Sequence, residues 1–421
     1  MNAVAILSLI VLILVIAVAW KTKVSPGILG VAGAFLIGFF VVIDGAAVST
    51  AAGGCGEILA AFPYKLIARI MFTALFFVTI SQNGTLEILT GKLIRISRGN
   101  ARLYPVIIFV ITAALQSLGV DSFTLTLILV PIACAVAREC GQNVIIYVVA
   151  VWCAEYGFAL TPVCYDYILA HGLAEENGFV LPAVNYYFRF AFLATLLFAL
   201  YYVMFGAYKV KKSTGTMENT VKKMNKSQVL STIFMIVFIV VALMGFEVSV
   251  VAATLACLLM LFTKADQKKV IADMPWSTLI LLIGMTMCIK MVGYAGGVDL
   301  LVNFFKMFMS NRTTAAIITL ISGLMSTVSS ATGVVQPTIA ATAKGLSETY
   351  GVEAGMLLMC SSIGSVATSI SPFSTLGGMS IGAAPEECNE NNAMFNKLLL
   401  VAVINLVAAV AYVFIGGLNT F

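Results

Sequence analysis

Two pairs of polar breaks interrupt long apolar stretches of this chain, and the second pair repeats the first. The first pair lies at residues 119–124 and 161–163, and the second at 329–333 and 371–375. Prolines in or just after the breaks are 206 and 210 residues apart: Pro131 and Pro337, and Pro162 and Pro372. Matching breaks at a nearly constant offset indicate a duplicated half. Many secondary transporters build their substrate site from duplicated halves with helices broken at membrane depth.

The composition requires a membrane protein. The chain is 61% hydrophobic and 10% charged, whereas soluble domains carry about 25% charged residues. The net charge of +5 does not indicate nucleic acid, because the basic residues lie in loops between apolar runs, where they report topology. We therefore expect a multi-pass protein of the cell (inner) membrane that binds no nucleic acid.

About ten transmembrane helices are expected. A crossing needs about 20 apolar residues, and eight apolar segments are candidates on that basis. Two broken crossings bring the expected total to about ten. The eight segments are 3–20, 27–44, 66–91, 185–207, 229–246, 248–263, 277–305 and 395–418.

Four remaining segments contain the polar breaks. Segments 103–138 and 313–345 are too long for one crossing, since 36 residues would span about 54 Å against about 30 Å of hydrocarbon. Each is predicted to be a re-entrant hairpin with its break at the tip. Segments 144–175 and 353–385 carry Thr-Pro and Ser-Pro, and proline removes a helical hydrogen bond. Each is predicted to be one crossing broken into half-helices, with a simple proline kink as the alternative.

Basic loops divide the chain and orient it. Loop 92–102 and linker 208–228 are rich in lysine and arginine, which places both on the cytoplasmic side. Each half then contains five crossings, and an odd number inverts the second half. The fold class predicted is an all-α polytopic membrane protein with two inverted repeats, residues 1–207 and 229–421, joined by the basic linker.

The breaks carry the predicted site. Half-helix N-termini suit a carboxylate, and half-helix C-termini and unwound carbonyls suit a sodium ion. Hydroxyl groups serve either ligand, with the alternative that they bond back to their own helices. The predicted substrate-binding residues are Ser122, Thr124, Thr161, Pro162, Ser329, Ser330, Thr332, Ser371, Pro372, Ser374 and Thr375.

Asp121 is the most informative single residue, because an ionisable side chain in a membrane segment is costly and indicates function. It would ligate a cation, carry a coupling proton, or only cap the second hairpin arm. Glu155, six residues before the Thr-Pro break, is the next candidate. The predicted sodium ligands are Asp121, Gly119, Ser117, Ser329 and Thr332.

The chain has no HExxH and no phosphate-binding loop. Its nine cysteines contain no CxxC pair. We therefore expect neither an enzyme nor a cofactor, with sodium only as a coupling ion.

Hydroxyl-rich hairpin tips paired with Thr-Pro or Ser-Pro breaks resemble the ion transporter superfamily. The run 329–337 together with 371–375 looks most like its malonate/dicarboxylate carrier branch, which is related to the divalent anion:sodium symporters. The resemblance implies an elevator-type mechanism, in which a transport domain slides against a scaffold domain that forms a homodimer. It also implies a small carboxylate substrate between the tips, with sodium sites beside it.

The leading hypothesis is a secondary active transporter of small organic anions, di- or tricarboxylates, coupled to sodium or protons. One alternative is a sodium/proton antiporter of the same superfamily. A second, from another class, is a membrane scaffold subunit that transports nothing. The partners expected are a small carboxylate, sodium or protons, the lipid bilayer and a second copy of the chain.

Overall fold

The computed structural model of the chain describes residues 3–22, 24–39, 42–43, 46–47, 58–85, 88, 101–139, 141–182, 184–209, 224–244, 246–263, 265–327, 330–383 and 393–418. These residues form helices, apart from the connections and a small antiparallel pair, β1 (Val42–Ile43) and β2 (Ala46–Ala47). Most of the linker, residues 210–223, and most of loop 92–102 lie outside the described residues.

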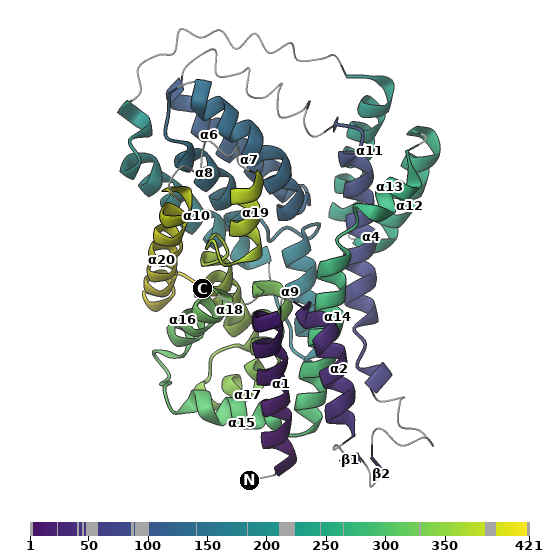
Figure 1. Cartoon of the computed structure of the whole chain (residues 1–421), viewed down its shortest axis with the longest axis vertical. Helices are drawn as coiled ribbons and strands as arrows, with labels where there is room; N and C mark the ends of the chain where they lie inside the picture. Colours follow the sequence, from purple (N-terminus) through teal and green to yellow (C-terminus); the bar gives the residue numbers. More distant parts are fainter. Residues whose placement is uncertain are drawn as a thin grey trace.

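One group of helices, which we call the right-hand group, lies on the right of Figure 1. Within it α2 packs against α14, and α12 packs against α4. Gly27 of α2 and Gly284 of α14 meet with no room for a side chain, since a Cβ on either would overlap the other helix's backbone. Small residues permit this approach in membrane helices. The group comprises α1 (Ala3–Thr22), α2 (Pro26–Gly38), α4 (Tyr64–Ser81), α11 (Lys226–Leu243), α12 (Val248–Thr263), α13 (Gln267–Ala272) and α14 (Trp276–Tyr294).

Segment 277–305, predicted as a crossing, is not one continuous helix. It consists of α14 and α15 (Gly297–Lys306), which meet at an angle of 88°. The bend follows from Gly296, whose φ of 80° ends α14 in the left-handed region. A glycine without Cβ adopts this conformation readily, and it is the usual residue just after a helix C-terminus. The length and apolar character of the segment did not reveal this turn.

The remaining long helices, the left-hand group, form two sets at different heights in Figure 1, with α6 and α7 near the top and α16 and α17 near the bottom. The first set is α6 (Tyr104–Ser117), α7 (Ser122–Glu139), α8 (Val144–Gly157), α9 (Tyr165–Glu176) and α10 (Val184–Met204). The second is α16 (Thr314–Ser326), the π-helical turn η4 (Ala331–Val335), α17 (Gln336–Tyr350), α18 (Ala354–Ala367), α19 (Thr375–Ala383) and α20 (Ala393–Phe414). Two short 3₁₀ turns, η2 (Ala101–Leu103) and η3 (Ala207–Lys209), flank the first set.

The two sets make the same contacts. Helices α6 and α7 both pack on α8, which packs on α10. Helices α16 and α17 likewise pack on α18, which packs on α20. The sets also exchange partners, since α7 contacts α19 and α17 contacts α9. The right-hand group shows the same exchange. Helices α2 and α4, which precede the basic linker, pack on α14 and α12, which follow it.

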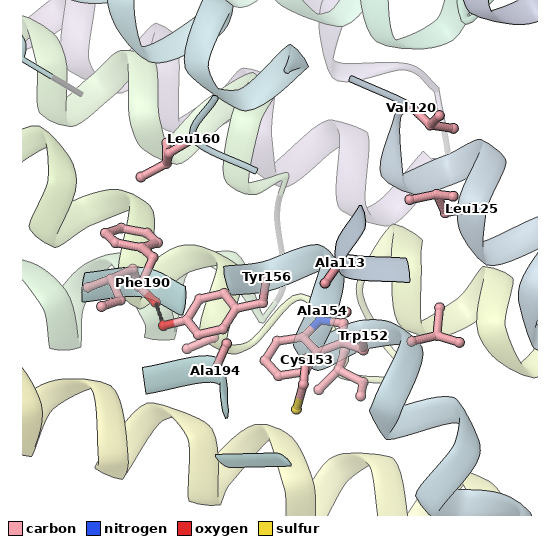
Figure 2. Close-up of a cluster of buried hydrophobic side chains, with 14 of the residues drawn as sticks. Ala113, Val120, Leu125, Trp152, Cys153, Ala154, Tyr156, Leu160, Phe190 and Ala194 are labelled. Carbon is pink, nitrogen blue, oxygen red and sulfur yellow. Dashed lines mark hydrogen bonds between the residues drawn. The ribbon is translucent and has the colours of Figure 1, made fainter. Parts of the chain in front are cut away.

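Helix α8 lies at the centre of the left-hand group because it is apolar on every side, the pattern of a fully buried helix. Residues 145–157 are all buried. Figure 2 shows Trp152 and Tyr156 of α8 beside Phe190 and Ala194 of α10. The Tyr156 hydroxyl donates to the carbonyl oxygen of Ile363 in α18 at 3.1 Å, which ties the two central helices together.

Three described helices, α4, α10 and α20, are long and apolar enough to cross a membrane, and the bent pair α14–α15 would be a fourth. Nine shorter apolar helices accompany them among the described residues. Several of these are arms of the predicted hairpins and broken crossings, and an arm of about 14 residues rises only about 21 Å.

Candidate functional site

The polar breaks of both sets open onto one cavity of about 120 Å³. It is lined by the first turns of four helical segments: α7, α9, η4 with α17, and α19. We name the connections by position: the first tip is 118–121, the first break 158–164, the second tip 327–330 and the second break 368–374. The cavity is the feature that joins tips and breaks from opposite halves of the sequence.

The first tip is a helix end followed directly by a helix start. Gly119, with φ of 96°, donates its N–H to Gln116, and Val120 donates to Leu115, which together close α6. Asp121 then caps α7. Its Oδ1 accepts the Thr124 N–H at 3.0 Å, and its Oδ2 accepts the Thr124 hydroxyl at 2.5 Å. Besides capping α7, Asp121 lines the cavity.

The first break holds the end of α6. The Thr161 hydroxyl donates to the Ser117 carbonyl oxygen at 2.7 Å, and the Cys164 thiol lies 2.9 Å from the Gln116 carbonyl oxygen. A helix leaves its last carbonyls without internal partners, and the break supplies them. Thr161 thus bonds to a neighbouring helix, a role outside both alternatives considered from sequence.

The second tip carries a neutral cap where the first carries an acid. The Ser330 Oγ accepts the Gly333 N–H at 3.1 Å, as Asp121 accepts the Thr124 N–H. The two caps are 209 residues apart, so Ser330 is the positional counterpart of Asp121. The Ser330 carbonyl then accepts from both Val334 and Val335, which produces the π-helical turn.

The second break is also capped by serine. The Ser374 hydroxyl oxygen accepts the Gly377 N–H at 3.3 Å, and this hydroxyl donates to backbone carbonyls within the break, including that of Ser369. The Ser369 hydroxyl oxygen in turn accepts the indole N–H of Trp152 at 3.0 Å. That bond joins α8 of the first set to the break of the second, across 217 residues.

The acids of the cavity all come from one helix set, and we call the lining from that set the first-set wall, or acidic wall. Asp121, Glu155 and Asp166 line the cavity, all from the first set of helices. Glu155 is 4% exposed, and its Oε1 accepts the Thr126 hydroxyl at 3.0 Å. Among the cavity residues that the structure describes, there is no lysine, arginine or histidine. The wall therefore carries acidic groups without a basic side chain beside them.

The lining from the second set of helices, which we call the second-set wall, carries three buried polar atoms without partners, and the Tyr165 hydroxyl of α9 is a fourth such atom in the cavity. Ser326 and Ser362 each have a hydroxyl, and Gln336 has a side-chain carbonyl oxygen, with no hydrogen-bond partner among the described residues. All three line the cavity and come from the second set. A buried polar group without a partner is rare and destabilising, and it calls for an explanation.

The predicted site residues separate into three groups. Those lining the cavity are Gly119, Asp121, Ser122, Ser330, Thr332 and Ser374. Those absent from the lining are Ser117, Thr124, Thr161, Pro162, Ser371 and Pro372. Ser329 lies outside the described residues, and the structure describes only the backbone of Thr375.

Away from the tips, sequence reasoning found Glu155 and missed other residues that line the cavity. Gln336 begins α17 and stands directly before Pro337, a signal that was present. Asp166 in the first turn of α9 had the same signal as Asp121, an acid within a predicted membrane segment, whereas Ser362 in α18 had no signal beyond polarity within an apolar run. No group of three histidine, cysteine, aspartate or glutamate residues within the described part of the chain is arranged to hold a metal ion.

Comparisons with known proteins agree with a transporter. No curated protein matches the sequence. Among solved structures, the chain is similar to the YdaH transporter of Alcanivorax borkumensis (TM-score 0.63, 13% identity, covering 93% of this chain and 97% of that one). It is also similar to MtrF of Neisseria gonorrhoeae, described as one of a class of antimetabolite efflux pumps (TM-score 0.61, 12% identity, 99% and 95%).

These identities are low, so the two structures establish the fold alone, an all-helical membrane fold like that of these transporters. The sequence itself gives the family. The profile of the citrate transporter family (CitMHS) matches residues 2–364, which is most of the 421 residues. The chain therefore belongs to the citrate transporter family of multi-pass membrane transporters.

Proposed function

We propose that this protein is a secondary active transporter that carries citrate-like di- or tricarboxylates across the cell (inner) membrane together with sodium ions or protons. The observation that carries the proposal is the contrast between the two walls of the cavity. The first-set wall has three acids, and the second-set wall has neutral caps, two partnerless hydroxyls and a partnerless amide oxygen.

Helix dipoles sharpen this contrast. Each helix N-terminus carries about half a positive charge, and four helical segments begin at the cavity. In the first set, Asp121 caps α7 and Asp166 lies in the first turn of α9, so carboxylates offset both dipoles. In the second set, Ser330 and Ser374 cap the helices without adding charge. The positive ends of η4–α17 and α19 are thus left for an anion.

The charge balance favours symport. A tricarboxylate that enters beside three acidic side chains meets strong repulsion, because like charges a few ångströms apart cost several kcal/mol at low dielectric. Cations that enter with it and lie against Asp121, Glu155 and Asp166 would remove the repulsion. We therefore place the carboxylates of the cargo at the second-set wall and the coupling cations at the first-set wall.

The movement we propose is an elevator built on two inverted repeats, residues 1–207 and 229–421. The repeated contacts support it, because each packing pair of the first helix set has a counterpart in the second. Segments 103–138 and 313–345 would form the re-entrant hairpins. About ten crossings would make up the rest of the fold. The left-hand group would slide against the right-hand group, and the latter would form the homodimer.

The test is uptake of labelled citrate, malate and succinate into proteoliposomes, with inward sodium or proton gradients imposed separately. We expect accumulation of at least one carboxylate driven by one of the two gradients. Sodium/proton exchange with no carboxylate uptake would overturn the proposal in favour of an antiporter, for which the three acids would serve as the ion site. Absence of both activities would support a scaffold subunit.

A further inference from the structure

We infer that Gln336 recognises the hydroxyl group of a 2-hydroxycarboxylate cargo, while Ser326 and Ser362 donate to the carboxylate beside that hydroxyl. The inference rests on the proposed function and names the feature of the substrate that the cavity selects. It distinguishes citrate-like cargo from tricarboxylates and dicarboxylates of the same charge that lack a hydroxyl.

The three side chains differ from their neighbours in the second set in having no partner, and the Tyr165 hydroxyl of α9 is the one other described lining atom in this state. Nearby hydroxyls are satisfied within the helices: Thr319 and Thr338 donate to backbone carbonyls of the preceding turn, and Ser322 donates to Ser361. Ser326, Gln336 and Ser362 are only 1%, 2% and 5% exposed, line the cavity, and have no hydrogen-bond partner among the described residues for the atoms named above. Burial at this level makes a missing partner costly, so a ligand that supplies partners gains affinity.

The chemistry of the three atoms defines the ligand. A serine hydroxyl has one hydrogen to donate, so Ser326 and Ser362 together supply two donors. A carboxylate only accepts, and its two oxygens match those donors. The Gln336 Oε1 also only accepts, so a carboxylate cannot satisfy it. A hydroxyl on the carbon that carries the carboxylate would donate to this oxygen.

The position of Gln336 fits this assignment. It is the first residue of α17, directly after the π-helical turn that Ser330 caps. The N-terminal end of η4–α17 has no acid in its first turn, so the positive dipole end favours a carboxylate there. Ser326, at the end of α16, and Ser362, in α18, bring the remaining donors to the same cavity from two other helices.

The test compares cargo that differs by one hydroxyl. Citrate and tricarballylate carry the same three carboxylates, and only citrate has the hydroxyl. Binding to the purified full chain is measured by titration, with transport competition as a second readout. We expect the wild type to bind citrate roughly 10-fold to 100-fold more tightly than tricarballylate, because the analogue leaves the Gln336 oxygen without a partner.

Gln336→Met keeps the side-chain volume and removes the acceptor. It should weaken citrate binding to the level of tricarballylate while tricarballylate binding stays at its wild-type value, and that retained binding shows that the variant folds. Ser362→Ala is the matched control within the cavity, and it should weaken both compounds by the same factor.

Equal binding of citrate and tricarballylate by the wild type would overturn the inference and leave the proposed function standing. Loss of both compounds by the same factor in Gln336→Met would also overturn it, since the amide would then contact a carboxylate. If the wild type binds neither compound, the inference fails together with the proposed cargo.

Discussion

Exchange of the two hairpin caps tests the charge contrast between the walls without removing a cap. Asp121 and Ser330 occupy equivalent positions, and each accepts the N–H three residues later. Aspartate and serine are nearly equal as helix caps. The variants Ser330→Asp and Asp121→Ser should therefore fold like the wild type, with a stability change of about 1 kcal/mol or less from the cap itself.

The expected effect on binding is much larger. Ser330→Asp places a negative charge on the wall assigned to the cargo carboxylates. At about 5 Å and an effective dielectric constant of about 20, one pair of unit charges interacts by about 3 kcal/mol, which corresponds to roughly 200-fold in affinity. We expect Ser330→Asp to weaken citrate binding by about this factor at constant cation concentration.

The reverse change should act on the cation. Asp121→Ser removes one carboxylate from the acidic wall, so the sodium or proton concentration needed for half-maximal citrate binding should rise, while citrate affinity at saturating cation changes little. Calorimetric titration of citrate at several sodium concentrations and pH values measures both quantities. Wild-type citrate affinity in a folded Ser330→Asp protein would refute the assignment of the walls.

Three further predictions concern residues outside the caps. Glu155→Gln should keep the fold, because the amide oxygen still accepts the Thr126 hydroxyl, and should reduce gradient-driven uptake at least tenfold; an unchanged gradient response would exclude Glu155 from coupling. Lys290→Gln breaks the 2.5 Å ion pair with Glu176 that joins α14 to the end of α9, and should speed hydrogen exchange at that end of α9; wild-type exchange would show that the pair restrains nothing. Gly284→Ala should abolish folded protein in detergent, since its Cβ would overlap the backbone of α2. Gly293→Ala in the same helix should be tolerated, because the atom nearest to its added Cβ lies 3.7 Å away. Equal melting temperatures for the two variants would contradict this packing of α2 on α14.

The parts of the fold that depend on local sequence were predictable. Pro162 and Pro372 lie within the connections that separate the half-helices, and the polar runs at 119–124 and 329–333 coincide with the helix ends at the tips. These features follow from backbone chemistry, because proline and glycine limit what a helix can do at their own position. The length of each apolar run likewise predicts where the chain crosses the membrane. It could not reveal the 88° turn between α14 and α15.

The parts of the site that depend on distant pairing were not predictable. Thr161 looked like a ligand from sequence, and its hydroxyl instead holds the end of α6 at Ser117. Gln336 entered the sequence analysis only within the run 329–337, and the structure gives it a partnerless oxygen in the cavity. Whether a hydroxyl or amide is satisfied depends on which helix packs beside it, and one sequence does not contain that information. The bond between Trp152 and Ser369, 217 residues apart, is an example.

The most direct test of the two-walled cavity is the simultaneous measurement of citrate and cation entry in the same proteoliposomes. Labelled citrate reports the anion, and internal pH and labelled sodium report the cations, with no cation gradient imposed at the start. The account predicts that external citrate drives entry of protons or sodium at a fixed ratio to citrate, and that neither ion enters without it. Citrate entry without any cation, or cation exchange that ignores citrate, would contradict it.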